Sequence, residues 1–237
     1  MSPHESAILT LAAASVGFFH TLLGPDHYVP FIAFSKAGKW SAAKTAVVTL
    51  LCGIGHVLSS VMLASLGILL GIGMRQIEAL ETSRARLATG LMIAFGLVYF
   101  VWGLRQAMRN RPHEHWHGHA DGIFHRHEHV HEATHIHTHE GEHSNNMTPW
   151  VLFVIFIFGP CEPLIPLVMY PAARGHLWAA GWVTVVFGAM TLMTMLGMVL
   201  ASCRGLNLLP LERMERYMPA LAGATISLCG LAMYFSS

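Results

Sequence analysis

The sequence predicts an all-α membrane protein of six transmembrane helices, arranged as two inverted repeats of three helices each. The 237 residues are 54% hydrophobic and only 11% charged, whereas a soluble domain carries about 25% charged residues. Apolar segments recur at the length of about 20 residues that a spanning helix needs. A Gly-Pro pair followed by two potential ligand residues interrupts one such segment in each half, at Gly24–His27 and at Gly159–Glu162.

Six segments are long and apolar enough to be membrane spans. The first and the fourth contain the Gly-Pro pair, which disfavours a continuous helix because Gly is flexible and Pro lacks a backbone N–H group. We therefore expect helices 1 and 4 to be broken at this pair. In chain order the segments are Ala7–Phe34, Ala46–Leu70, Ala88–Leu104, Trp150–Ala172, Leu177–Ala201 and Met218–Phe235.

The segments divide the chain into two repeats joined by a polar loop. Residues 1–104 form the first repeat, residues 105–148 a cytoplasmic His-rich loop expected to be disordered, and residues 149–237 the second repeat. Besides the Gly-Pro pair, Lys39–Ala43 matches Leu177–Ala180, and Gly96–Phe100 matches Gly230–Phe235, all about 135 residues apart. Three helices per repeat make the second copy enter from the opposite side, as in many secondary transporters.

The basic residues favour one orientation of the chain in the membrane. Most Lys and Arg residues fall on the side of the long loop, while Arg75, Arg84, Arg86 and Arg174 are assigned to the other side. Because basic residues are in excess on the cytoplasmic side, we expect the long loop inside the cell and both termini outside. Met1–Glu5 lacks the basic region of a signal peptide, so we expect the first segment to be retained.

Potential metal ligands surround the first Gly-Pro pair. His20 and His27 are spaced to share one helix face, and the break lets Asp26 turn toward the same space. His56 in the next segment would complete the ligand set, and the two glycines just before it allow a neighbouring helix to approach closely. Such nitrogen and oxygen ligands suit Ni²⁺, Co²⁺ or Zn²⁺. The alternative is that these histidines cap or bridge helices through hydrogen bonds.

The segment from His20 to His27, followed by Gly55–Ser60, resembles the nickel/cobalt transporter families. These carry a His…Asp-His signature in an early helix and a Gly-His or similar motif in the next. They belong to the lysine-exporter-like superfamily of six-helix permeases, with urease-accessory and sulfite-exporter-type membrane proteins. The resemblance implies that His20, Asp26, His27 and His56 select the transported ion. The interval between the first two histidines is one residue longer here and its acidic residue is replaced by Leu or Gly, so the ion stays open.

Cys161 and Glu162 take, in the second half, the places that the ligand pair takes in the first. A thiolate and a carboxylate can both bind metal or carry protons, and we expect them to face the first site across a pseudo-twofold axis. The alternative is an inert thiol and a carboxylate at the aqueous end. Thr191 and Thr194 lie roughly at the place of His56 and are candidate lining hydroxyls, unless they bond their own helix backbone.

The second motif also resembles a Pro-Cys-x-x-Pro-like motif of the membrane thiol–disulfide transporters of cytochrome c maturation. Those use one cysteine in each repeat to pass electrons by disulfide exchange. The matching residue in the first repeat is Asp26, so thiol–disulfide or electron transfer would require Cys52, Cys203 or Cys229 to lie beside Cys161. An anion exporter of the same superfamily is a third possibility, but it leaves the His-rich loop unexplained.

The long loop carries twelve of the 17 histidines, many at alternate positions. Short His-rich tracts bind metals, but flexible ligands cannot discriminate between ions by geometry. We therefore expect the loop to capture or sense metal rather than to select it. Its histidines are His113, His115, His117, His119, His125, His127, His129, His131, His135, His137, His139 and His143.

Together these features predict a secondary transporter, not an enzyme, for a divalent transition-metal cation in a bacterial inner (plasma) membrane. Ni²⁺ or Co²⁺ is the first candidate and Zn²⁺ a further one, and the cytoplasmic loop favours export slightly. We expect membrane lipid and the metal ion as partners, neither nucleic acid nor a prosthetic group, and leave a homo-oligomer or an accessory chain open. The chain has no P-loop motif for nucleotide binding. Asp26, Glu162 or the histidines are candidate proton carriers.

Overall fold

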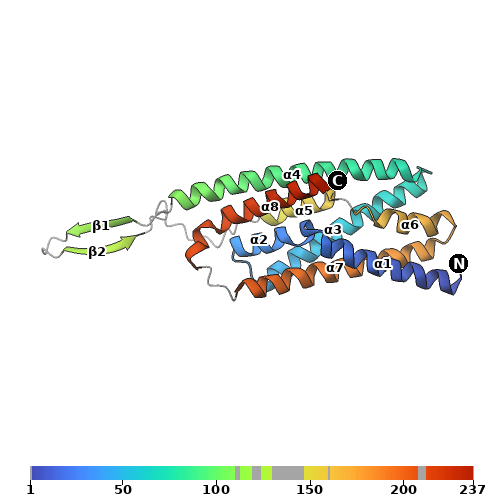
Figure 1. The fold of residues 1–237 in the computed structure, drawn as a ribbon, viewed down its shortest axis with the longest axis horizontal. Coiled ribbons are helices and arrows are strands. Elements are labelled where there is room, and N and C mark those ends of the chain that lie inside the picture. The colour runs from blue at the N-terminus through green and yellow to red at the C-terminus, as the bar shows by residue number, and fades with distance from the viewer. Residues whose placement is uncertain are drawn as a thin grey trace, which may run out of the picture.

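The computed structural model describes residues 2–109, 113–118, 124–129, 147–159, 161–207 and 212–236. These residues form an elongated bundle of helices with a two-stranded hairpin beyond one end (Figure 1). The helices are α1 (Pro3–Leu23), α2 (Val29–Ala37), α3 (Ala42–Leu69), α4 (Met74–Arg109), α5 (Met147–Phe158), α6 (Leu164–Ala173), α7 (Leu177–Asn207) and α8 (Met218–Ser236), with 3₁₀ turns η1 (Pro25–His27) and η2 (Glu212–Tyr217).

Five of the described helical segments are long and apolar enough to cross a membrane, which confirms the prediction of an integral membrane protein. They are α1, α3, α4, α7 and Met214–Phe235, which contains most of α8. Their outer surfaces are apolar as well, since Leu69 is 81% exposed and Trp178 is 90% exposed. The predicted span Trp150–Ala172 corresponds to α5 and α6, two shorter apolar helices.

The first helical segment ends before Gly24. Ser2 starts α1 with a capping box, because its hydroxyl accepts a hydrogen bond from the Glu5 N–H and the Glu5 carboxylate accepts one from the Ser2 N–H. At the other end the Gly24 N–H donates to His20 O at 3.1 Å. Pro25 opens the short turn η1, where its missing N–H group is no loss. His27 therefore lies in a turn between α1 and α2, not in a helix interior.

A similar connection joins α5 to α6. The Gly159 N–H closes α5 with hydrogen bonds to Ile155 O at 2.9 Å and to Phe156 O at 3.1 Å. Cys161 O and Glu162 O then accept hydrogen bonds from the first N–H groups of α6, at 3.0 and 3.2 Å. Cys161 and Glu162 thus lie in the connection between the two helices.

Helix α4 is much longer than the predicted span of 88–104. Its buried face continues toward the N-terminus through Ile77, Glu81 and Ala85, which are spaced one helical turn apart. Exposed polar residues such as Glu78 and Ser83 lie between them, so mean hydropathy alone hides this part of the helix. The structure places in α4 three basic residues that the charge pattern assigned to a loop opposite the long one, namely Arg75, Arg84 and Arg86.

Small residues let α8 pack closely along the C-terminal part of α4 (Figure 1). Gly96 of α4 lies against Ser227, and Gly230 of α8 lies against Ile93, so that a Cβ atom at either glycine would overlap its neighbour. Elsewhere α1 and α2 pack against α7, while α3 packs against α5, α6 and α7. The bundle encloses two buried apolar clusters, one around Phe31 and Phe156 and one around Phe187.

The described part of the His-rich loop contains regular structure, where the sequence predicts disorder. Helix α4 continues to Arg109, and β1 (His113–Gly118) pairs with β2 (Phe124–His129) in an antiparallel hairpin. The register pairs histidines with histidines, namely His113 with His129, His115 with His127 and His117 with His125. The other loop histidines, His119, His131, His135, His137, His139 and His143, lie outside the described residues.

Candidate metal centre

Three histidines converge where α1 ends. His20 lies in the last turn of α1, His27 ends η1, and His56 lies near the middle of α3. Each offers one ring nitrogen, and the three nitrogens all lie within 4.8 Å of one another. The ring centroid of His27 lies 4.7 Å from that of His20 and 5.1 Å from that of His56, and the ring planes are nearly perpendicular in both pairs. His27 and His56 are buried and His20 is half-buried, so three imidazoles could hold one ion.

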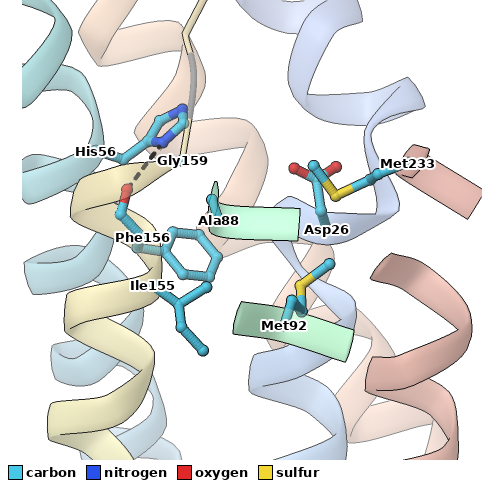
Figure 2. A pocket seen from close by; sticks show the side chains of 8 residues that line it. All are labelled: Asp26, His56, Ala88, Met92, Ile155, Phe156, Gly159 and Met233. Carbon is cyan, nitrogen blue, oxygen red and sulfur yellow. Dashed lines mark hydrogen bonds between the residues drawn. The ribbon is translucent and has the colours of Figure 1, made fainter. Parts of the chain in front are cut away.

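Backbone carbonyls fix the orientation of two of these rings. His27 Nδ1 lies 3.2 Å from Gly24 O, and His56 Nδ1 lies 3.3 Å from Phe156 O, the contact dashed in Figure 2. Because a carbonyl only accepts hydrogen bonds, Nδ1 carries the proton and Nε2 keeps its lone pair free for a metal ion. Metal-binding histidines commonly donate their second ring nitrogen in this way.

The Nε2 atoms of His20, His27 and His56 are all buried and have no hydrogen-bond partner among the described residues. A buried polar atom without a partner costs about 1–3 kcal/mol, and three in one place are unusual for a folded protein. One cation bound between them would supply a partner for all three lone pairs. The predicted convergence of the three histidines is therefore found, and the group could hold a metal ion.

The glycines of both Gly-Pro motifs make room for these rings. A Cβ atom added to Gly24 would lie 2.6 Å from His27 Nδ1, and one added to Gly159 would lie 3.2 Å from His56 Nδ1. Gly53 and Gly55 lie against α7 and α5, where added Cβ atoms would lie 2.6 Å from Leu192 and 3.0 Å from Phe153. The close helix approach expected beside His56 is thus observed.

Asp26 does not belong to the group of three converging nitrogens. Its Oδ1 lies 3.3 Å from His27 Nδ1, the ring nitrogen that also faces Gly24 O. The carboxylate lines a small cavity of about 20 Å³, on the opposite side from His56 (Figure 2). The thioether side chains of Met92 and Met233 line the same cavity. In this structure Asp26 is placed to orient and charge-stabilise the His27 ring.

The candidate residues of the second half differ in their burial. Cys161 is fully buried among apolar side chains, whereas Glu162 is exposed. Thr191 is fully buried, with its hydroxyl unpartnered among the described residues, and Thr194 is half-buried. Neither Cys161 nor Glu162 contributes a ligand atom to the converging group within the part of the chain that the structure describes.

The cysteines are all reduced in this structure. Cys161 has no disulfide partner, and Cys52, Cys203 and Cys229 are free as well. A disulfide-exchange mechanism needs a second thiol beside Cys161, but Cys161 belongs to the apolar cluster around Phe187, whereas the other three cysteines belong to or pack against the cluster around Phe31 and Phe156.

The structure also reveals a buried ion pair that the sequence reasoning missed. Glu81 of α4 is fully buried, and its Oε1 lies 2.9 Å from Arg84 Nη1. Arg84 Nη2 donates to Ser59 Oγ at 2.8 Å and to Ile157 O at 2.7 Å. The available signal was the buried stripe of α4, on which an acid and a base stand three residues apart.

No protein-family model, curated protein or solved structure matches the chain. What the site can do is therefore argued from its own geometry.

Proposed function

We propose that this chain is a permease for a divalent transition-metal cation, Ni²⁺ or Co²⁺ first and Zn²⁺ as a further candidate. The observation that carries the proposal is the convergence of three buried, unpartnered imidazole nitrogens, from His20, His27 and His56. Imidazole suits these borderline ions, whereas Mg²⁺ and Ca²⁺ prefer oxygen ligands. The nearby Asp26 carboxylate adds negative charge beside His27, which favours a cation.

The place of the site favours transport over a structural metal. His27 lies in the turn η1, between two helices of an integral membrane protein. Irregular backbone at membrane depth is tolerated where it is buried in protein or lines a cavity, and transporters use such broken helices to bind their substrates. A purely structural ion would need no such interruption.

We further propose six spans in two inverted repeats, with α1 and α2 forming one interrupted span and α5 and α6 another. The packing of three helix pairs supports this arrangement, because α1 packs against α7, α5 packs against α3, and α4 packs against α8. In two three-helix copies related by a twofold axis, the first helix of each copy would pack against the second helix of the other, and the two third helices would pack against each other. Rocking of one repeat against the other would then open the histidine site to each side in turn.

The direction we propose is export across a bacterial inner membrane, with both termini outside. In that orientation the His-rich loop lies in the cytoplasm, where it could collect ions for the site. Deletion of the gene should then raise the sensitivity of the cell to the metal. A lower metal content in the deletion strain would show import instead.

Metal binding to the purified protein tests the proposal most directly. Ni²⁺ binding is measured for the whole chain and for a variant without residues 113–143, each with and without His27→Ala. We expect the shortened chain to keep one site and His27→Ala to remove it. If removal of the loop abolished all binding, the intramembrane site would lose its support.

A further inference from the structure

We propose that Glu81, Arg84 and Ser60 form a proton-binding site through which proton movement drives metal release. This inference rests on the proposed function, because it assigns the ion that is exchanged for the metal. The site lies between α3 and α4, and shares no ligand residue with the histidine group.

The carboxyl group of Glu81 is only half satisfied. Its Oε1 is paired with Arg84, but its Oε2 is buried and lacks a hydrogen-bond partner among the described residues. Ser60 of α3 lies close enough to interact with this carboxyl group. Its hydroxyl is fully buried and likewise has no hydrogen-bond partner among the described residues. A proton on Oε2 would turn that acceptor into a donor. The Ser60 hydroxyl oxygen could then accept the hydrogen bond from this O–H group.

Arg84 connects this carboxyl group to the metal centre. Its guanidinium binds Ser59 Oγ, and the Ser59 hydroxyl donates to His56 O at 2.8 Å. The guanidinium also binds Ile157 O, the carbonyl next to the one that holds the His56 ring. Arg84 and His56 therefore hold adjacent carbonyl groups at the C-terminal end of α5, where the helix dipole favours cations.

The charge on Glu81 decides whether Arg84 is neutralised. With the carboxylate ionised, the pair has no net charge, and a divalent cation can bind to the neighbouring histidines without repulsion from this pair. With a proton on Oε2, the guanidinium charge is uncompensated in a setting of low dielectric and opposes the metal ion. Metal and proton therefore weaken the binding of each other, and linkage makes the effect reciprocal.

The proposed exchange transfers a proton and involves no oxidation or reduction. Water on one side of the membrane delivers a proton to Oε2, an O–H bond forms, and the metal ion leaves. When the next metal ion arrives, the O–H bond breaks and the proton returns to water on the other side. Besides Arg84, the titratable groups that interact with Glu81 in the described residues are Cys161 and Glu162 of the α5–α6 connection. Of these two, Cys161 is buried and Glu162 is exposed.

Glu81→Gln tests the proposal, because it keeps the shape of the side chain and mimics its protonated form. The full chain is reconstituted in liposomes, and Ni²⁺ movement and proton movement are followed with two dyes. We expect opposed Ni²⁺ and proton fluxes in the wild type, and loss of the Ni²⁺-dependent proton flux in Glu81→Gln. The control is Glu78→Gln, an exposed acid one turn earlier on the same helix, which should leave both fluxes unchanged.

Metal binding separates the charge effect from misfolding. At pH 8 we expect Glu81→Gln to bind Ni²⁺ about fivefold more weakly or worse, in the usual range of coupling between sites. Adding Arg84→Gln removes the uncompensated charge and should restore the affinity to within about twofold of the wild type, since the two residues act as a pair. The thermal unfolding transition of each variant, measured alongside, distinguishes a change in affinity from a structural defect, because Glu81→Gln alone leaves a buried unpaired charge.

Two results would overturn the inference while leaving the proposed function intact. One is a Glu81→Gln protein that moves protons with Ni²⁺ at the wild-type ratio, and the other is a double variant that binds as weakly as the single one. Absence of Ni²⁺ transport by the wild type would overturn the proposed function and the inference with it.

Discussion

Replacing Gly24 with Ala should weaken metal binding without unfolding the protein. The backbone at Gly24 has φ −91° and ψ 94°, a conformation open to alanine, so any effect comes from the added methyl group. Its carbon atom would lie 2.6 Å from His27 Nδ1 and 2.9 Å from both Asp26 Oδ1 and His20 O. To restore an ordinary contact of 3.4 Å, the His27 ring must move by roughly 0.8 Å, enough to spoil a preorganised site.

The expected magnitude follows from what this shift does to the ring. It disturbs the hydrogen bond from Nδ1 to Gly24 O and moves Nε2 away from the other two ligand nitrogens. Changes to such supporting contacts typically cost 10- to 100-fold in metal affinity, or about 1.4–2.8 kcal/mol. Gly159→Ala, with its new carbon atom 3.2 Å from His56 Nδ1, needs a shift of only roughly 0.2 Å and should cost less than about threefold.

Ni²⁺ affinity is measured by competition with a chromophoric chelator, on protein without residues 113–143, so that the loop adds no sites. Gly90→Ala serves as the control, because an added Cβ atom there meets nothing within 4 Å. It should leave the affinity unchanged and slightly raise the thermal stability, since alanine is the better helix former. Equal affinities for Gly24→Ala and Gly90→Ala would refute the idea that the His27 position sets metal binding.

Three further outcomes are expected. His27→Ala and His56→Ala should each lower Ni²⁺ affinity at least about 100-fold, since losing a ligand exceeds the loss of a supporting contact; isothermal titration checks this against the exposed His4→Ala, and comparable losses in all three would contradict it. Cys161→Ser should leave Ni²⁺ transport in liposomes within about twofold of the wild type, because the buried thiol is not among the converging ligands; abolished transport would instead implicate the thiol. Metal binding by residues 113–143 should fall as the pH drops through about 6.5, because protonated imidazole cannot ligate a metal; equilibrium dialysis between pH 8 and pH 5 measures it, and constant binding would point to carboxylate ligands.

Much of the fold follows from the sequence because lipid imposes simple requirements. Long apolar runs predict spanning helices, and the Gly-Pro pair predicts the end of α1, since Pro cannot donate an intrahelical hydrogen bond. The sequence prediction missed the extra turns of α4 because Glu81 and Arg84 form an ion pair inside the bundle. Hydropathy treats each charged residue as solvent-exposed, so it cannot anticipate such a pair.

The histidine group could be predicted because histidines are rare within membrane-spanning segments, and because His20 and His27 flank one break. The place of Asp26 could not be predicted, because a residue in a turn can point to either side and its direction depends on neighbouring helices. The hydrogen bonds that orient the rings come from backbone carbonyl groups, which every residue carries. Sequence patterns therefore contain no specific signal for them.

The second Gly-Pro motif serves the metal centre through its backbone. In a continuous helix Phe156 O would accept a hydrogen bond from the N–H group four residues later, but that position is Pro160, which has none. The carbonyl is thereby available to the His56 ring, and Gly159 leaves space for that ring. In the proposed metal centre the first motif would supply a ligand and the second would orient one, so that Cys161 and Glu162 need not resemble Asp26 and His27. The asymmetry between the two halves is then what the proposed single metal centre between two proposed repeats would require.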